Sequence, residues 1–176
     1  KNLDKYIMKI LVTGAAGFIG SHLCETLLKT TSYQIIGLDN INDYYDPNLK
    51  LARIEQLKPY KNFMFEKINI ANRESLAQTF QSFKPNKVVN LAAQAGVRYS
   101  IKNPYAYMES NLVGFLNTIE LCRHNNIEGL IFASSSSVYG GNTKIPFSVD
   151  DRVDNPISLY AASKKSNELI ANAYSH

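Results

Sequence analysis

Two residues near the end of the chain could carry a proton transfer. Tyr160 and Lys164 lie four positions apart in the stretch YAASK, so on a helix they share one face. A phenol is a weak base at neutral pH, and an ammonium group held beside it stabilises the phenolate form. Such a pair could take a proton from a substrate hydroxyl while a hydride leaves the same carbon. The same spacing also occurs in ordinary surface helices, so the pair needs support from the rest of the sequence.

A run of four serines, residues 134–137, supplies hydroxyl groups shortly before this pair. A hydroxyl can both donate and accept a hydrogen bond, so one of the four could relay a proton between a substrate and Tyr160. The alternative is a polar strand end whose hydroxyls bond the local backbone. We expect that alternative to hold for some of the four serines.

A glycine-rich turn near the start of the chain predicts a dinucleotide site. Gly14, Gly17 and Gly20 follow an apolar run, and glycine lets the backbone bend sharply and approach a ligand. The helix expected next offers unpaired N–H groups to a pyrophosphate. Asp39, nineteen positions after Gly20, could accept hydrogen bonds from both hydroxyls of an adenosine ribose and would repel a 2′-phosphate. The pattern therefore favours NAD over NADP. The alternative is a turn without a ligand and a solvated Asp39.

The elements that must position these residues alternate between strands and helices. Hydrophobic patterning predicts strands at 7–12, 33–39, 62–70, 88–92 and 130–134, and helices at 18–29, 47–57, 72–83, 105–124 and from about 158. With right-handed crossovers this order gives an α/β fold with a doubly wound parallel sheet, a Rossmann fold. Ligands bind such sheets at the carboxyl ends of the strands. Residues that end or follow a strand are Gly14, Asp39, Asn69, Ala92 and Ser135.

The composition bounds the class of protein. The 176 residues are 45% hydrophobic and 19% charged with a net charge of +4, which suits one domain with a full core. The sequence has neither a long run of Lys and Arg nor an apolar stretch of bilayer length, so we expect no nucleic-acid or membrane partner. Cys24 and Cys122 lack metal-ligand spacing, so we expect buried thiols, no metal site and a cytoplasmic protein. The domain is expected to span residues 8–176, after an N-terminal extension of residues 1–7.

The motifs TGAAGFIG, LDN, LAAQAGVRYS, NLVG, SSSSVYG and YAASK, in this order and spacing, resemble the extended short-chain dehydrogenase/reductases that act on nucleotide sugars. Within that family, NDYYDP and AGVRYSIKNP resemble the UDP-glucuronate 4-epimerases. The similarity covers residues 8–176. Members of the family continue into a smaller domain that holds the nucleotide and sugar, so we expect this sequence to be the N-terminal part of a longer protein.

The resemblance implies NAD as the cofactor and a UDP-sugar as the substrate. Its cofactor contacts correspond to Gly14, Gly17, Phe18, Ile19 and Gly20 at the pyrophosphate, Asp39 and Asn40 at the adenosine ribose, Asn69 and Ile70 beside the adenine, Leu91, Ala92, Ala93 and Gln94 on the nicotinamide side, and Asn111 in the long helix. The resemblance also implies Ser135 as the hydroxyl relay and Tyr160 as the base. Tyr160 and Lys164 are further expected cofactor contacts, with Lys164 on the nicotinamide ribose. Many relatives carry Asp where this chain has Asn69. Because an amide both donates and accepts, we expect changed affinity rather than lost binding.

Ser136 and Ser137 bear on the type of reaction. At these positions related dehydratases carry an acid pair and related decarboxylases a single Glu, whereas a hydroxyl is a far weaker base. The absence of these acids favours 4-epimerisation through a transient 4-keto sugar. The resemblance implies conversion of UDP-glucuronate to UDP-galacturonate, and without the smaller domain we expect little activity in this fragment. A UDP-galactose 4-epimerase, a nucleotide-sugar dehydratase and a non-catalytic dinucleotide-binding module remain alternatives. The family often dimerises through the long helix and the last helix, so a homodimer is a further expectation.

Overall fold

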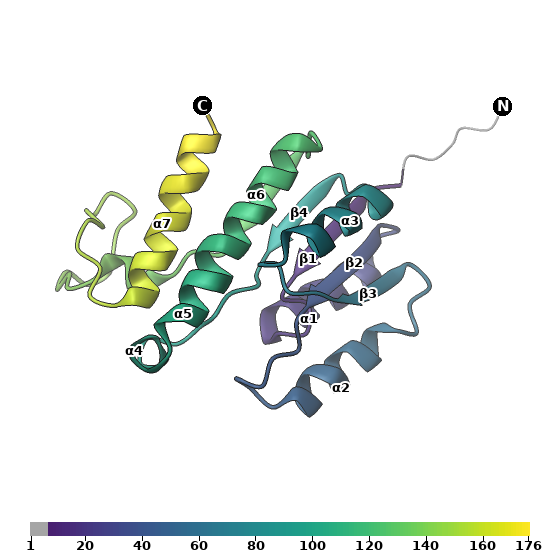
Figure 1. The fold of residues 1–176 in the computed structure, drawn as a ribbon, viewed down its shortest axis with the longest axis horizontal. Coiled ribbons are helices and arrows are strands. Elements are labelled where there is room, and N and C mark those ends of the chain that lie inside the picture. The colour runs from purple at the N-terminus through teal and green to yellow at the C-terminus, as the bar shows by residue number, and fades with distance from the viewer. Residues whose placement is uncertain (1–6) are drawn as a thin grey trace.

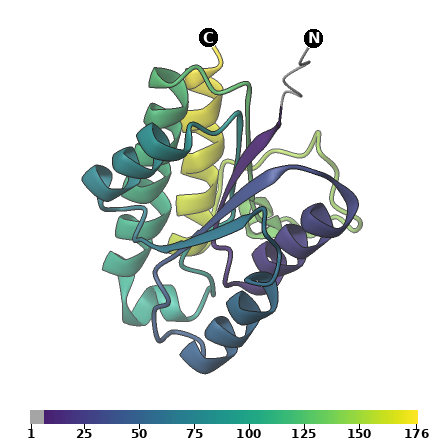
Figure 2. The same cartoon turned by 90° about the vertical axis from the view of Figure 1, so that its right-hand side faces the viewer.

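The computed structural model describes residues 7–176, which form a five-stranded parallel sheet with helices on both faces (Figures 1 and 2). The strands are β1 (Lys9–Thr13), β2 (Gln34–Asp39), β3 (Phe63–Lys67), β4 (Lys87–Asn90) and β5 (Gly129–Phe132). Their order across the sheet is β3-β2-β1-β4-β5, so the direction of winding reverses between β1 and β4. The predicted doubly wound sheet is therefore confirmed. The expected N-terminal extension falls almost wholly outside the described residues.

The helices cover the sheet in two layers. They are α1 (Phe18–Thr30), α2 (Pro47–Leu57), α3 (Arg73–Phe83), α4 (Tyr99–Lys102), α5 (Pro104–Tyr107), α6 (Gly114–His124) and α7 (Leu159–Tyr174), with a π-helix η1 (Met108–Val113) and a 3-10 helix η2 (Ser136–Tyr139). Figure 2 shows α1 and α2 on one face and α3 and α6 on the other, and α7 lies beside α6 in Figure 1. Between residues 7 and 176 no helix is both long and apolar enough to cross a membrane.

Successive side chains of β1 pack alternately into the two hydrophobic clusters, one on each face of the sheet. Ile10 and Val12 pack in the cluster on the α1–α2 face, which also holds Cys24. Leu11 packs in the cluster on the opposite face, which holds Cys122. Burial raises the pKa of both thiols to about 12, so they remain neutral. The expectation that both cysteines are buried core residues is confirmed.

The third strand is shorter than its apolar pattern predicts. It ends at Lys67 rather than at Ile70, because its partner β2 ends at Asp39, which is paired with Lys67. The chain then turns, with the Ile68 amide donating to the Asp39 carbonyl at 3.0 Å. This early end releases Asn69 from the sheet and turns it toward the strand ends.

The helix predicted at 105–124 is not one regular α-helix. It begins at Pro104, and η1 interrupts it with a wide turn in which the Gly114 amide donates to the Glu109 carbonyl. A Cβ on Gly114 would lie 2.6 Å from Cγ1 of Ile70, so glycine allows the two segments to pack this closely. The segment before it, where the patterning predicts neither strand nor helix between residues 92 and 105, contains the short helix α4. Apolar spacing alone does not distinguish a π turn from an α turn.

Candidate functional site

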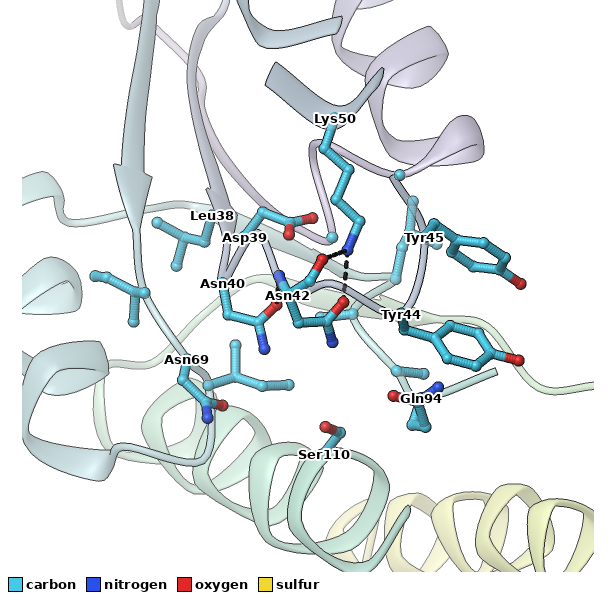
Figure 3. Close-up of a pocket in the computed structure, with 17 residues that line it drawn as sticks. Leu38, Asp39, Asn40, Asn42, Tyr44, Tyr45, Lys50, Asn69, Gln94 and Ser110 are labelled. Carbon is cyan, nitrogen blue, oxygen red and sulfur yellow. Dashed lines mark hydrogen bonds between the residues drawn. The ribbon is translucent and has the colours of Figure 1, made fainter. Parts of the chain in front are cut away.

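A cavity opens at the carboxyl ends of β1, β2, β3 and β4 (Figure 3). Most of the residues expected to contact a cofactor line it, namely Gly14, Gly17, Asp39, Asn40, Asn69, Ile70, Leu91, Ala92, Ala93 and Gln94. The lining also includes residues that the sequence did not single out, namely Leu38, Asn42, Tyr44, Tyr45, Lys50, Ile68 and Ser110. The cavity lies at the reversal of strand order, where doubly wound sheets bind their ligands.

The glycine turn brings three backbone segments into close contact. Gly14 has φ +72°, and a Cβ there would lie 2.7 Å from the amide nitrogen of Ala92. A Cβ on Gly20 would lie 2.1 Å from the Gly14 carbonyl oxygen, so Gly20 lets α1 approach the turn. Phe18 and Ile19 point outward with exposed fractions of 67% and 65%. The turn therefore forms an open cradle beside the start of α1, and any side chain on Gly14 would collide with the backbone at Ala92.

Two backbone amides fix the Asp39 carboxylate at the end of β2. Its Oδ2 accepts from the Ala16 amide at 3.1 Å and its Oδ1 from the Ile41 amide at 2.9 Å. Each carboxylate oxygen keeps further acceptor capacity on its cavity side. Asp39 is thus a preorganised acceptor next to the glycine turn.

Lys50 closes the loop that follows Asp39. Its ammonium group donates to the backbone carbonyl of Asn42 at 2.8 Å and to the Asn42 side chain at 2.6 Å (Figure 3). Burial lowers the pKa of Lys50, and the nearby Asp39 charge opposes that shift. A sequence signal existed, because Lys50 shares the spacing of the buried residues Ile54 and Leu57 on α2.

The end of β3 is tied to the long helical segment. The Asn69 side chain donates through Nδ2 to Oε1 of Glu109 at 2.8 Å, and its Oδ1 accepts from the Ala71 amide at 3.0 Å. Asn117 of α6 donates to the carbonyls of Ile70 and Ala71 at 3.0 and 3.1 Å. These bonds hold Asn69 and Ile70 against one side of the cavity.

Asn111 lies behind the cavity wall rather than in it. The side chain is 2% exposed, accepts from the Gln94 amide at 2.8 Å and donates to Ser163 Oγ at 2.9 Å. Its own carbonyl accepts from the Asn167 side chain at 2.7 Å. Asn111 therefore joins the wall at Gln94 to α7, the helix that carries Tyr160 and Lys164.

The Tyr160 and Lys164 pair lies on α7, beyond the residues that line the cavity. The Tyr160 ring packs edge-on to Tyr107 with centroids 6.1 Å apart, and the Tyr107 hydroxyl donates to the Ala95 carbonyl at 2.8 Å. Lys164 is 5% exposed and donates to the Ala133 carbonyl at 2.9 Å. Burial lowers the pKa of Lys164 to about 8. The pair thus stands next to the chain segment that continues the cavity wall past Gln94.

The serine run divides into different local roles. Ser134 Oγ donates to Oε1 of Glu168 at 2.5 Å, which commits its proton to a carboxylate. Ser135 is half-buried, and its Oγ accepts from the Ser137 amide at 3.1 Å, so its own proton remains available for donation. The structure therefore favours Ser135 over Ser134 as a relay.

The sheet order, the glycine cradle and the preorganised Asp39 define a dinucleotide-binding α/β protein. Residues 11–176 match the family model described as GDP-mannose 4,6 dehydratase. The chain belongs to this family, one of the extended short-chain dehydrogenase/reductases.

The chain is also similar to individual proteins of known sequence or structure. The chain is 57% identical over 169 residues to Protein CapI of Staphylococcus aureus, covering 96% of this chain and 50% of the relative. It is 50% identical over 168 residues to UDP-glucuronate 4-epimerase 4 of Arabidopsis thaliana, covering 95% and 38%. A crystal structure of UDP-glucuronic acid 4-epimerase from Bacillus cereus with UDP-glucuronic acid and NAD superposes with a TM-score of 0.87 at 38% identity, covering 95% and 52%. The chain thus spans about half the length, or less, of these relatives.

Proposed function

We propose that residues 8–176 are the NAD-binding domain of a nucleotide-sugar 4-epimerase that converts UDP-glucuronate to UDP-galacturonate. The observation that carries the proposal is the cavity at the strand reversal, where the Gly14 cradle and the Asp39 carboxylate face one site. The Bacillus cereus relative, whose structure is described with NAD and UDP-glucuronic acid, supports the choice of both ligands.

The residues present fit NAD. The open turn at Gly14 and Gly17, beside the start of α1, suits a pyrophosphate, which needs backbone N–H groups and no intervening Cβ. Asp39 suits the adenosine ribose, because a carboxylate accepts from two hydroxyls and repels a 2′-phosphate. When bound, NAD would supply reversible hydride acceptance at carbon 4 of the sugar.

The chain's own side chains would handle the proton. Tyr160 removes it from the hydroxyl on carbon 4, Ser135 positions that hydroxyl, and the Lys164 ammonium favours the phenolate form of the tyrosine. Lys164 is held by the Ala133 carbonyl, close to the serine run. Ser136 and Ser137 place no carboxylate where a dehydratase would need one. The supported reaction is therefore oxidation and re-reduction without elimination.

A full-length protein assayed with UDP-glucuronate, and separately with UDP-galactose, tests this function. We expect interconversion of UDP-glucuronate and UDP-galacturonate, with NAD retained through turnover. Loss of water from the sugar would indicate a dehydratase, and conversion of UDP-galactose alone would indicate a different sugar. Bound NAD without any conversion would favour the non-catalytic module. The 176-residue chain itself is expected to bind NAD with little turnover, since it spans about half the length of its relatives.

The groove between α6 and α7 supports a homodimer as part of this proposal. Leu112 lines it, and Val113, Leu116 and Leu169 there have exposed fractions of 47%, 43% and 60%. A second copy packing its own α6 and α7 on this face would bury all four side chains. Sedimentation should then show a dimer that Leu169→Glu converts to a monomer; a wild-type monomer at high concentration would contradict it.

We also propose a cytoplasmic location, consistent with the two free cysteines.

A further inference from the structure

The exposed Glu109 carboxylate accepts a hydrogen bond from Asn69, a residue that lines the cavity. We propose that Glu109 accepts a hydrogen bond from the exocyclic amine of adenine and that Asn69 positions it for this contact. The inference rests on the proposed NAD site and deepens it, because it assigns a residue that discriminates among purines.

The order of the strands places the adenine. With the pyrophosphate at the turn after β1 and the ribose at Asp39 after β2, the base falls beside the end of the next strand, β3. There Leu38, Ile68 and Ile70 provide apolar surface for the faces of a purine. Asn69 and Ser110 add polar side chains to the lining of this part of the cavity (Figure 3).

Asn69 is poorly suited to serve as the acceptor itself. Its Oδ1 already accepts from the Ala71 amide at 3.0 Å, and its Nδ2 donates to Oε1 of Glu109 at 2.8 Å. An exocyclic amine needs an acceptor, and a carboxylate accepts more strongly than an amide oxygen. Among the described residues no hydrogen bond reaches the second oxygen of Glu109, Oε2. The Asn69 side-chain amide therefore holds Oε1 of Glu109 and leaves Oε2 free to accept from the adenine amine.

The π-helix fixes the backbone of Glu109 relative to Ile70, which lines the cavity. The Glu109 carbonyl accepts from the Gly114 amide, and Gly114 packs directly on Ile70, where any Cβ would meet Cγ1 at 2.6 Å. Asn117 then bonds the Ile70 carbonyl at 3.0 Å. Glu109 and Ile70 are thus parts of one packed unit, although 39 positions separate them in the sequence.

Binding of two dinucleotides tests the proposal. Nicotinamide hypoxanthine dinucleotide differs from NAD at the base, where a carbonyl oxygen replaces the exocyclic amine. Calorimetric titration of the dinucleotide-free chain should show NAD bound about tenfold more tightly, since the carbonyl would face a carboxylate. In Glu109→Gln the preference should fall below about threefold, because glutamine can donate to the carbonyl. The matched control Glu120→Gln removes the same charge from α6, away from the cavity, and should keep the wild-type preference.

Exchanging the acid and the amide tests the positioning role. Asn69→Asp alone places a second carboxylate next to that of Glu109, and the repulsion between the two charges should weaken binding of both dinucleotides. Asn69→Asp combined with Glu109→Gln restores a donor–acceptor pair and should restore the preference for NAD. An unchanged preference in Glu109→Gln would overturn the proposal while leaving the NAD site intact, as would a double variant without the preference. A wild-type chain that binds neither dinucleotide would overturn both the NAD site and this inference.

Discussion

The adenosine end and the reaction end of the site are built differently. At the adenosine end, Asp39 and Asn69 are held by backbone amides, and both line the cavity. At the reaction end, Ser135 directly precedes η2, Tyr160 and Lys164 lie on α7, and none of the three lines the cavity. Under the proposed function, separate parts of the chain carry NAD binding and proton transfer, so we expect substitutions to affect them separately.

The two ends meet in one stretch of the long helix. Within η1, Glu109 bonds Asn69 at the adenosine end, and Asn111 bonds both Gln94 and Ser163 toward the reaction end. Tyr107, directly before η1, packs against the Tyr160 ring. The helix therefore sets the position of both ends relative to the sheet.

The largest expected effect is confined to the reaction end. Tyr160→Phe in the full-length protein should lower turnover of UDP-glucuronate about 10³-fold, because the proposed base is removed. The affinity of the 176-residue chain for NAD should change less than about threefold, because Tyr160 does not line the cavity. Turnover comes from an epimerisation assay and affinity from calorimetry. Tyr105→Phe, at a residue 82% exposed, is the control and should change neither quantity. Unaltered turnover in Tyr160→Phe would remove the tyrosine from the mechanism.

The next largest effect is expected at the glycine turn, where we propose that the pyrophosphate binds. Gly20→Ala places a Cβ 2.1 Å from the Gly14 carbonyl oxygen, a backbone atom that cannot move without opening the turn. We expect about 3 kcal/mol lost from the free energy of unfolding, or NAD affinity lowered at least about 100-fold if the turn shifts instead. Chemical denaturation and calorimetry measure the two. Gly129→Ala is the matched control, because its Cβ would meet nothing closer than 4.0 Å. Equal behaviour of the two variants would contradict the close approach of α1.

Lys164 gives the reaction end a pH dependence of its own. Burial lowers its pKa from 10.5 to about 8, so the unfolded chain binds this proton more tightly than the folded chain does. The folded state should therefore gain up to about 3 kcal/mol of stability from this group as the pH rises from 8 to 10.5. The gain appears as the difference between wild type and Lys164→Met in denaturation at several pH values. Lys165→Met should instead follow the wild-type profile, and a Lys164→Met profile parallel to wild type would contradict the shift.

The smallest effect concerns the choice of cofactor. Asp39→Asn should lower NAD affinity about tenfold and narrow the gap between NAD and NADP, because the charge that repels a 2′-phosphate is gone. Calorimetry with both dinucleotides measures the change. Asp46→Asn is a suitable control, since asparagine caps α2 as well as aspartate does while removing the same charge. An unaltered ratio of NAD to NADP affinity in Asp39→Asn would contradict the proposed contact between this carboxylate and the adenosine ribose.

Features that depend only on residues close together in the sequence could be predicted from it. The helix at Pro47–Leu57 was predicted with these approximate bounds, because a proline marks its first turn. Gly14 and Asp39 could be placed at the strand ends for the same reason, as each directly follows or ends an apolar run.

Other features required contacts between distant segments. The π turn of η1 depends on Gly114 meeting Ile70, and the early end of β3 depends on where β2 stops. Lys50 could have been noticed as a charge on a buried stripe, but its bond to Asn42 depends on how the loop folds back. Glu109 gave no local signal, because its partner Asn69 lies 40 positions away.

A crystal structure of the chain with NAD tests the central claim most directly. The account predicts the pyrophosphate against the turn at Gly14 and Gly17, the adenosine ribose on Asp39, and the adenine between Ile70 and the π-helix. It further predicts the nicotinamide end directed along Leu91–Gln94 toward Tyr160. A dinucleotide bound elsewhere, or a cavity that stays empty at saturating NAD, would contradict it.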